Sequence, residues 1–453
     1  MYSSTTARLL LLGAAGFAGA TLQVVPGASW TATNTGMPIQ AHGAAIFKEN
    51  GIFYWIGEDK SEGTAFQNVN CYSSTNLVEW SFVNTLLSRT MSGDLGPGRI
   101  VERPKVLCNN DTDKYVMYLH IDDHTYSDAR VGVAVSDSVC GNYTYSTSWR
   151  PLGFESRDIG LFKDDDGSAY LLTEDRKNGL RINALTDDYL NVSRKVHLFD
   201  RHFESPALLK RDGYYFVFGS NLTGWYPNDN KYAYAKSLSG PWAEWQSFAP
   251  EGLRTYNSQT SFILPLGGDD DAFIYLGDRW ARENLMRSTY LWLPLEFSGT
   301  RVTLKNRVSW VPHVHKASWS PAPQETDYEA EKAVLKGGAF EVPCSKCSGR
   351  AYVGGIGGEQ KGSVEFYGFN SQNSTRSTLR IVYSNPDSSE RFANVTINNV
   401  SQIITFLPTR GEDIWNSASV HADFESWVSN PTLIQGVDDG LGPNIDRIFL
   451  PNY

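Results

Sequence analysis

Short apolar runs and polar turns alternate along the chain up to Trp310, and five segments repeat one pattern. Each has a short apolar strand, a turn rich in Asp, Asn and Gly, and a strand rich in aromatic residues. A third strand-like segment often follows, such as RVGVAVSD or KYAYAKSL, and the period is roughly 45 to 60 residues. Repeats of several short strands are typical of a β-propeller, so the sequence predicts five blades. A β-sandwich built from successive hairpins is the alternative, but the third segments recur in register and favour the propeller.

The repeat pattern stops after Trp310, which predicts a domain boundary. The stretch 317–327 is rich in Pro, Ser and Ala and is typical of a linker. Residues 328–453 contain further strand-like segments, such as STLRIVYS and IDRIFLP, in a length that suits a β-sandwich. The sequence therefore predicts an all-β protein, with a five-bladed β-propeller at 21–316 and a β-sandwich (jelly-roll) domain at 328–453.

The first 20 residues have the pattern of a signal peptide. Arg8 precedes an apolar run that is too short to span a membrane, and the small residues 18–20 offer a cleavage site. We therefore expect a secreted, extracellular protein. Seven glycosylation sequons fit that route and predict a glycoprotein: Asn110, Asn142, Asn191, Asn221, Asn373, Asn394 and Asn399.

The five cysteines fit an oxidising compartment. Cys344 and Cys347 lie close together and predict a local disulfide, with a zinc half-site as the other interpretation. Cys71, Cys108 and Cys140 leave an odd thiol, and their pairing stays open.

Charge and composition narrow the class of partner. The formal net charge is −10, which argues against nucleic acid and against anionic membranes as partners. No basic stripe or glycine-rich phosphate loop is present. We expect a monomer.

Carboxylates stand at the head of the repeated strands. When the five units are aligned on their first strands, equivalent positions hold Gly43, Glu102, Asp158, Glu204 and Gln259. The first strand of each propeller blade lines the central axis, so we expect these residues to meet at the mouth of one funnel. Like charges held so close raise at least one pKa, as a general acid requires. Separate, solvated strand ends are the alternative.

Carboxylates in a pocket rich in Trp and Tyr favour chemistry on a glycosidic bond. Aromatic faces stack on sugar rings while the carboxylates transfer protons. Trp225, Tyr226 and Trp280 are candidate platforms because they lie in loop-like sequence, although core packing is the commoner role of a tryptophan.

At these residues the chain resembles glycoside hydrolase family 43, and within it the fungal exo-β-1,3-galactanases. The resemblance spans nearly the whole mature chain. It is carried by the motifs IQAHGAAI, FYWIGEDKS, VERPKV, SRDIGLF, FESPAL, SQTSF and GDRW.

The resemblance implies roles for individual residues. Glu204 matches the general acid, and Asp158 matches the carboxylate that orients it and tunes its pKa. Most of the family places the general base, an aspartate, where this chain has Gly43. The remaining candidates are Gln259, which we expect to position the water, and Glu102, a substrate ligand and alternative proton acceptor. Further sugar contacts that the resemblance suggests are Glu58, Tyr126, Thr223 and Trp225, and no cofactor for catalysis is implied.

The C-terminal domain resembles carbohydrate-binding module family 35, which implies a structural Ca²⁺ ion. Glu329 and Glu331 alternate on a strand and project from one face, and Asp446 on a last strand would close an oxygen cage. A solvated acidic edge is the alternative. Candidate sugar ligands in this domain are Tyr352, Arg391 and Asn444.

Three hypotheses follow. The first is a secreted, inverting exo-β-1,3-galactanase that releases galactose from the non-reducing end of β-1,3-galactan, the backbone of arabinogalactan. The second is another family 43 activity, an arabinofuranosidase or xylosidase. The third is a propeller lectin without catalysis, an idea that Gly43 keeps open and that Glu204 and Asp158 argue against.

Overall fold

The computed structural model describes residues 21–267, 272–368, 375–412, 414–426 and 428–452. The predicted signal peptide at 1–20 and the sequon at Asn373 lie outside these ranges. The described chain is built almost entirely of antiparallel strands, and α1 (Arg254–Asn257) is a single turn. No helix in the described ranges has the length and apolar character needed to cross a membrane.

Five four-stranded sheets follow one another along the chain, each with its strands in sequence order. The first contains β1 (His42–Glu49), β2 (Ile52–Glu58), β3 (Asn68–Ser74) and β4 (Ser81–Ser88). The second contains β5 (Ile100–Asn109), β6 (Lys114–Asp122), β7 (Arg130–Ser136) and β8 (Thr144–Trp149). The third contains β9 (Ile159–Lys163), β10 (Ala169–Asp175), β11 (Gly179–Leu185) and β12 (Val192–Leu198). The fourth contains β13 (Phe203–Arg211), β14 (Tyr214–Asn221), β15 (Lys231–Ala235) and β16 (Gln246–Ser247). The fifth contains β17 (Gln259–Pro265), β18 (Phe273–Arg279), β19 (Thr289–Ser298) and β20 (Arg301–Leu304).

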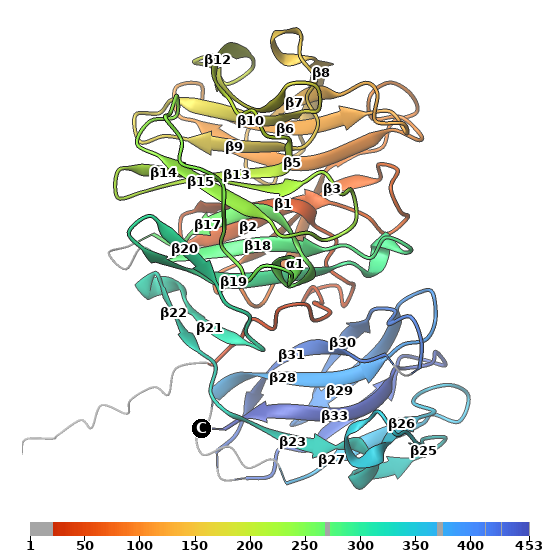
Figure 1. Cartoon of the computed structure of the whole chain (residues 1–453). Helices are drawn as coiled ribbons and strands as arrows, with labels where there is room; N and C mark the ends of the chain where they lie inside the picture. The colour runs from red at the N-terminus through yellow and green to blue at the C-terminus, as the bar shows by residue number, and fades with distance from the viewer. Residues whose placement is uncertain (1–20, 268–271, 369–374, 413, 427, 453) are drawn as a thin grey trace, which may run out of the picture.

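The first strands of these sheets form a ring of contacts. β1 contacts β5, β5 contacts β9, β9 contacts β13, β13 contacts β17, and β17 returns to β1. The sheets stack on one another in the upper part of Figure 1. Residues at the heads of the five first strands are therefore brought close to one another.

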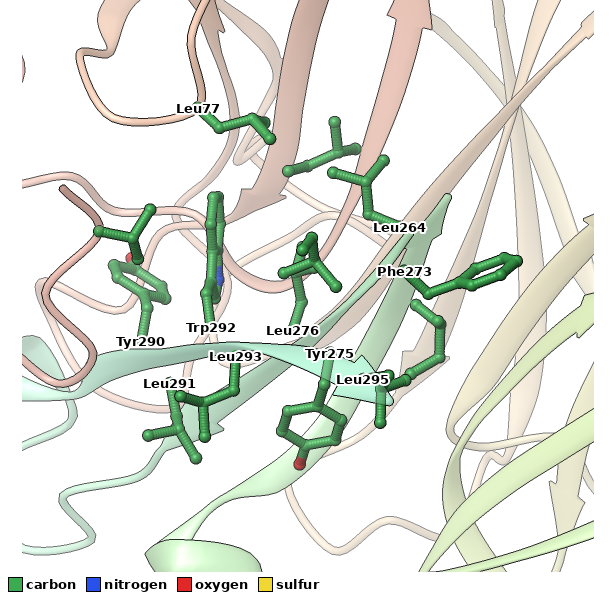
Figure 2. Packing of buried hydrophobic residues seen from close by; sticks show 14 of the residues in the cluster. Leu77, Leu264, Phe273, Tyr275, Leu276, Tyr290, Leu291, Trp292, Leu293 and Leu295 are labelled. Atoms are coloured by element: carbon green, nitrogen blue, oxygen red, sulfur yellow. The ribbon is translucent and has the colours of Figure 1, made fainter. Parts of the chain in front are cut away.

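Aromatic side chains join the fifth sheet to the first. Trp292 of β19 lies 4.6 Å from Trp55 of β2 and 4.9 Å from Trp30, between ring centroids. Figure 2 shows Tyr290 and Trp292 on one face of β19 and Leu291 and Leu293 on the other, and all four are buried. Aromatic pairs of this kind contribute about 0.5–1.5 kcal/mol each beyond the area they bury, so this cluster holds the ends of the ring together.

A register difference appears in the first sheet. In the second, fourth and fifth sheets the heads of the first strands pair as Glu102 with His120, Glu204 with Ser220, and Gln259 with Asp278. The matching pair in the first sheet is His42 with Glu58, so His42, and not Gly43, is equivalent to these residues. The prediction for Gly43 was therefore wrong by one residue. A bulge begins directly after His42, Glu102 and Glu204, and after Thr260 in the fifth sheet. Gly43, Arg103 and Ser205 are the bulge residues, with φ values of 55°, 56° and 54°.

The segment predicted as a linker, 317–327, contains regular strands. β21 (Trp310–His313) pairs with β22 (Ser318–Pro321), and β23 (Glu325–Glu329) pairs with the last strand, β33 (Asn444–Pro451). Its Pro and Ser content suggested a loop. However, the Arg307 guanidinium lies over the ring of Trp319, 4.4 Å from the ring centroid, and this contact fixes the β21–β22 hairpin.

The C-terminal part contains two antiparallel sheets that share one apolar cluster. The larger sheet has the order β25-β26-β33-β28-β31, with β23 also paired to β33; its further strands are β25 (Phe340–Pro343), β26 (Ala351–Gly354), β28 (Thr375–Ser384) and β31 (Asn416–Phe424). The smaller sheet has the order β24-β27-β32-β29-β30; its strands are β24 (Val334–Lys336), β27 (Ser363–Phe366), β29 (Arg391–Ile397), β30 (Val400–Phe406) and β32 (Thr432–Gly436).

The segment that precedes β1 connects the two parts of the molecule. Thr21 and Ser29 form parallel bridges with Ser377 and Ala418 of the larger C-terminal sheet. The Ser29 hydroxyl is 2.6 Å from the hydroxyl of Tyr383, and both groups are buried.

The cysteines are now assigned. The predicted Cys344–Cys347 disulfide is confirmed, a second disulfide joins Cys71 to Cys140, and Cys108 is a free thiol.

Candidate active site

A cavity of about 460 Å³ opens where the heads of the first strands meet. Six of the predicted site residues line it together: Glu102, Tyr126, Asp158, Glu204, Trp225 and Gln259. Arg103, His120 and Arg176 also line it and were not predicted. The alternative of separate, solvated strand ends is wrong, because Glu102, Asp158, Glu204 and Gln259 are each less than 10% exposed.

Glu204 is surrounded by negative charge. It groups with Asp158 and Glu174 so that one oxygen of each carboxylate lies within 4.8 Å of the others. Burial, and then the charges of Asp158 and Glu174, raise the pKa of Glu204 to about 9. Glu204 is therefore held as a neutral carboxylic acid at neutral pH, with a proton to donate.

Asp158 is held in place from two sides. Its Oδ2 accepts hydrogen bonds from the backbone N–H and the hydroxyl of Ser205, at 3.0 and 2.9 Å, and lies 3.1 Å from Arg103 Nε. Ser205 is the residue after Glu204, so these bonds fix the acid strand against Asp158. The positive φ of Ser205 turns its N–H toward the carboxylate.

The side-chain amide of Gln259 uses all but one of its hydrogen-bonding positions. Its Nε2 donates to Glu204 Oε1 at 2.8 Å, while its Oε1 accepts from Trp280 Nε1 at 2.8 Å and from the Arg103 guanidinium at 2.5 Å. Arg and indole nitrogens are donors only, so they fix the orientation of the amide. One N–H of the amide remains to donate to a substrate or a water.

Glu102 belongs to a chain of buried charges. Lys60 Nζ lies 2.9 Å from Glu102 Oε1 and 2.8 Å from Glu58 Oε2. Burial alone would raise the pKa of Glu102, but Lys60 and His120 hold it well below its usual range. His120 is in turn 2.9 Å from Asp122, and although burial opposes it, Asp122 and Glu102 raise its pKa to about 9.

The remaining predicted residues of this site lie around the cavity. Thr223 donates its backbone N–H to Glu204 Oε1 at 3.4 Å, and Tyr126 donates its hydroxyl to Glu102 Oε1 at 3.2 Å. Trp280 lies behind Gln259, and its ring contacts Trp225 edge-on with centroids 4.8 Å apart. Tyr226 is 57% exposed, and its ring is 4.8 Å from the Arg282 guanidinium.

Sequence reasoning singled out Glu58 at the end of β2 but missed other charged residues of second strands or just beyond them. Glu174 of β10, a neighbour of Glu204, and Lys60, two residues beyond β2, were not predicted. A signal for both existed in the sequence, because each charge closely follows a short apolar run, in LLTED and YWIGEDK. Arg103 was missed although it lies inside the VERPKV motif, since a bulge position was not expected to point into the site.

The C-terminal candidates fall into two groups. Glu329 and Asp446 both contact Ser348, and a side chain at Gly349 would collide with the Glu331 carboxylate. By contrast, the proposed sugar ligands are engaged elsewhere: Arg391 donates to Asp387 and to the Gly442 carbonyl, Asn444 to Ser384, and Tyr352 is buried against Trp415.

The chain was compared with known proteins. The family model of glycosyl hydrolases family 43 matches residues 37–291. No curated protein matches. An exo-β-1,3-galactanase from Phanerochaete chrysosporium, crystallised with galactose, is similar at 36% sequence identity and a TM-score of 0.67, over 94% of this chain and 99% of that one. A variant of the same protein was crystallised with β-1,3-galactotriose. An exo-β-1,3-galactanase from Clostridium thermocellum is similar at 26% identity and a TM-score of 0.64, over 93% and 99% of the two chains.

The family match covers more than half of the chain, and it includes all the residues that line the cavity. This chain therefore belongs to glycosyl hydrolase family 43.

Proposed function

We propose that the protein is a secreted, inverting exo-β-1,3-galactanase that releases galactose from the non-reducing end of β-1,3-galactan. The observation that carries this proposal is the neutral Glu204, buried between two carboxylates in a cavity that also holds Trp225. A carboxylic acid with a raised pKa is the proton donor that glycoside hydrolysis requires. The substrate is taken from the two exo-β-1,3-galactanases to which the chain is similar.

In this proposal Glu204 donates its proton to the glycosidic oxygen, and Asp158 positions the acid through Ser205. Gln259 orients a water with its remaining N–H. Its imidic tautomer is disfavoured, because the O–H of that tautomer would face Trp280 and Arg103, which cannot accept a hydrogen bond. Glu102 binds sugar hydroxyls together with Tyr126, while Thr223 and Trp225 complete the sugar pocket.

The five sheets are the five blades of a β-propeller in this proposal, and the two C-terminal sheets form a β-sandwich carbohydrate-binding module of family 35. The ring of first-strand contacts and the shared C-terminal apolar cluster support these assignments. Residues 1–20 act as the signal peptide, and two disulfides suit an oxidising exterior. No cofactor takes part in catalysis.

The activity test is a substrate panel. Purified protein is incubated with β-1,3-galactan, β-1,4-galactan and arabinoxylan, and the released sugars are identified. We expect galactose from β-1,3-galactan alone, released first as the α-anomer. Release of arabinose or xylose would instead establish another family 43 activity, and binding without release from any polymer would establish the lectin.

We propose that Glu329, Glu331 and Asp446 hold a structural Ca²⁺ ion. One buried oxygen of Glu329 and one of Glu331 lack a hydrogen-bond partner, and burial, with the nearby charge of Glu329, raises the pKa of Asp446 to about 6 despite Arg447. Buried acidic oxygens left without donors are what a hard cation would neutralise.

We expect a chelator to lower the melting temperature of the full-length protein, and added Ca²⁺ to restore it, because a ligand bound only by the folded state stabilises that state. The Glu331→Gln variant should lose this response, whereas the matched control Glu359→Gln, on an exposed side chain of the same domain, should keep it. A melting temperature that responds equally in both variants, or not at all in the unchanged protein, would eliminate the site.

A further inference from the structure

Arg176 is an exposed cation in the wall of the cavity. Its side chain is 42% exposed, whereas Asp158 and Glu204 in the same wall are each less than 10% exposed. The other exposed residues that line the cavity are Leu222 and Gly224, which carry no polar side-chain group. Arg176 is therefore the charged hydrogen-bond donor at the outer part of the cavity.

The turn that carries Arg176 is fixed by a buried aspartate. Arg176 directly follows β10, in the turn to β11. Asp175 is 1% exposed, and its Oδ1 accepts from the backbone N–H groups of Lys177 and Asn178 at 3.1 and 3.2 Å. Its Oδ2 accepts from Asn178 Nδ2 at 2.8 Å and from Arg181 Nε at 2.7 Å. Because the turn is held at four points, a ligand of Arg176 would not have to order the backbone.

Glu174 connects Arg176 to the candidate acid. The Glu174 carboxylate is buried, and its Oε1 accepts a hydrogen bond from Arg176 Nε at 2.6 Å. One oxygen of Glu174 lies within 4.8 Å of oxygens of both Asp158 and Glu204. The Glu174 backbone N–H donates to the Asp158 carbonyl at 3.0 Å, which anchors this part of β10 beside Asp158. The Arg176 guanidinium is thus held next to the carboxyl group that would protonate the leaving oxygen.

The guanidinium of Arg176 has donors left for a ligand. A guanidinium carries five N–H groups. Within the described ranges, only the N–H on Nε of Arg176 has a hydrogen-bond partner, which is Glu174. The four N–H groups on the two terminal nitrogens are therefore free to donate to hydroxyl oxygens.

The cavity has a buried inner part and an exposed outer part. Glu102, Glu204 and Gln259 are all buried in the inner part, at the heads of the first strands. A chain that enters with its non-reducing end would place its terminal galactose among these residues. The second galactose, which is the leaving group, would then lie beyond Glu204 toward the outer part, where Arg176 is exposed.

We propose that Arg176 binds the leaving galactose of β-1,3-galactan and donates to a hydroxyl beside the 3-linked oxygen. This inference rests on the proposed function. In that linkage the leaving oxygen is O3, and the ring carries hydroxyls on both neighbouring carbons, C2 and C4. A donor held next to the acid that protonates O3 is close to these hydroxyls. Glu174 is a positioning residue that holds the guanidinium, and Arg176 favours a sugar over a leaving group without hydroxyls.

The first experiment compares two substrates that both need protonation of the leaving oxygen. For Arg176→Ala we expect kcat/KM on β-1,3-galactobiose to fall about 10–100-fold, the usual loss for a hydrogen bond from a charged donor. Methyl β-galactoside has no hydroxyl on its leaving group, so its kcat/KM should stay nearly unchanged. The matched control is Arg194→Ala, an exposed arginine of β12 in the same sheet, which should leave both values unchanged.

A binding measurement separates the contact from catalysis. In the Glu204→Gln background, which should not turn over the disaccharide, Arg176→Ala should raise the Kd of β-1,3-galactobiose. The Kd of galactose, which occupies only the inner part of the cavity, should not change. Titration calorimetry with the two sugars gives both values on the full-length protein, and its melting curve confirms that the variant is folded.

Two results would overturn the assignment. One is a folded Arg176→Ala variant with unchanged kcat/KM and Kd for β-1,3-galactobiose, which would leave Arg176 without a sugar contact. The other is an equal loss of kcat/KM on β-1,3-galactobiose and methyl β-galactoside, which would mean that Arg176 acts on the acid through Glu174. Both results require a protein that releases galactose, so the proposed function would stand. Inactivity of the unchanged protein on β-1,3-galactobiose would remove the proposed function, and this inference with it.

Discussion

Glu204→Gln is expected to lower kcat on β-1,3-galactan by about 10²–10⁴-fold. The neighbours of Glu204 keep its proton in place, and an amide cannot donate one to the glycosidic oxygen. A substrate with an activated aryl leaving group needs little protonation, so its kcat should fall much less. The measurement is kcat on both substrates for the variant and the unchanged protein.

The pH profile provides a second measure of the same residue. The acid form of Glu204 exists below its pKa of about 9, so activity on galactan should be lost as the pH rises through that value. This alkaline limb should vanish in Glu204→Gln. The control Glu244→Gln, on an exposed side chain, should keep both the rate and the limb. Equal losses on the two substrates would remove Glu204 from the role of acid.

The repeat pattern predicted the sheets because it depends on local spacing. Each first strand, turn and aromatic strand is contiguous in sequence, so Glu102, Asp158, Glu204 and Gln259 were placed at one cavity correctly. The prediction failed in the first sheet, where Gly43 was placed at the head of the strand instead of His42. Bulges add residues without changing the apolar pattern, and a glycine beside a histidine gave no sign of which one pairs with β2.

Contacts between distant segments could not be predicted from the sequence, for a different reason. Lys60 joins Glu58 to Glu102 only because β1 packs against β5, and Glu174 meets Glu204 only because neighbouring sheets pack face to face. The Cys71–Cys140 pair likewise depends on the packing of the first two sheets. Local propensity carries no information on such pairs, whereas the two cysteines of PCSKC could be paired from spacing alone.

The backbone at Gly43, where the resemblance implied an aspartate in most of the family, is held firmly in place. Gly43 donates its N–H to Asp278 at 3.2 Å, and its carbonyl accepts from Lys105 at 2.6 Å, so the peptide is fixed on both sides. Burial, and then Arg103, lower the pKa of Lys105 to about 7, which reduces the charge held under the site. The space at Gly43 is thus a rigid feature that Glu58 and Arg103 occupy.

Gln259→Ala is expected to lower kcat by at least ~10²-fold even on activated aryl galactosides, because the water must be oriented whatever group leaves. The change removes the donor to the water, the bond to Glu204, and the acceptor that holds Arg103 and Trp280. Substrate binding should weaken only modestly, whereas Glu102→Gln should raise KM more, since in the proposed function Glu102 binds sugar hydroxyls.

The control for this prediction is Gln246→Ala, an exposed glutamine of β16, which should behave like the unchanged protein. The measurement is kcat and KM for the three variants on one aryl galactoside, with and without azide. If Gln259→Ala keeps a near-normal kcat while Glu102→Gln loses it and is rescued by azide, then Glu102 is the base. That outcome would contradict the role proposed for Gln259.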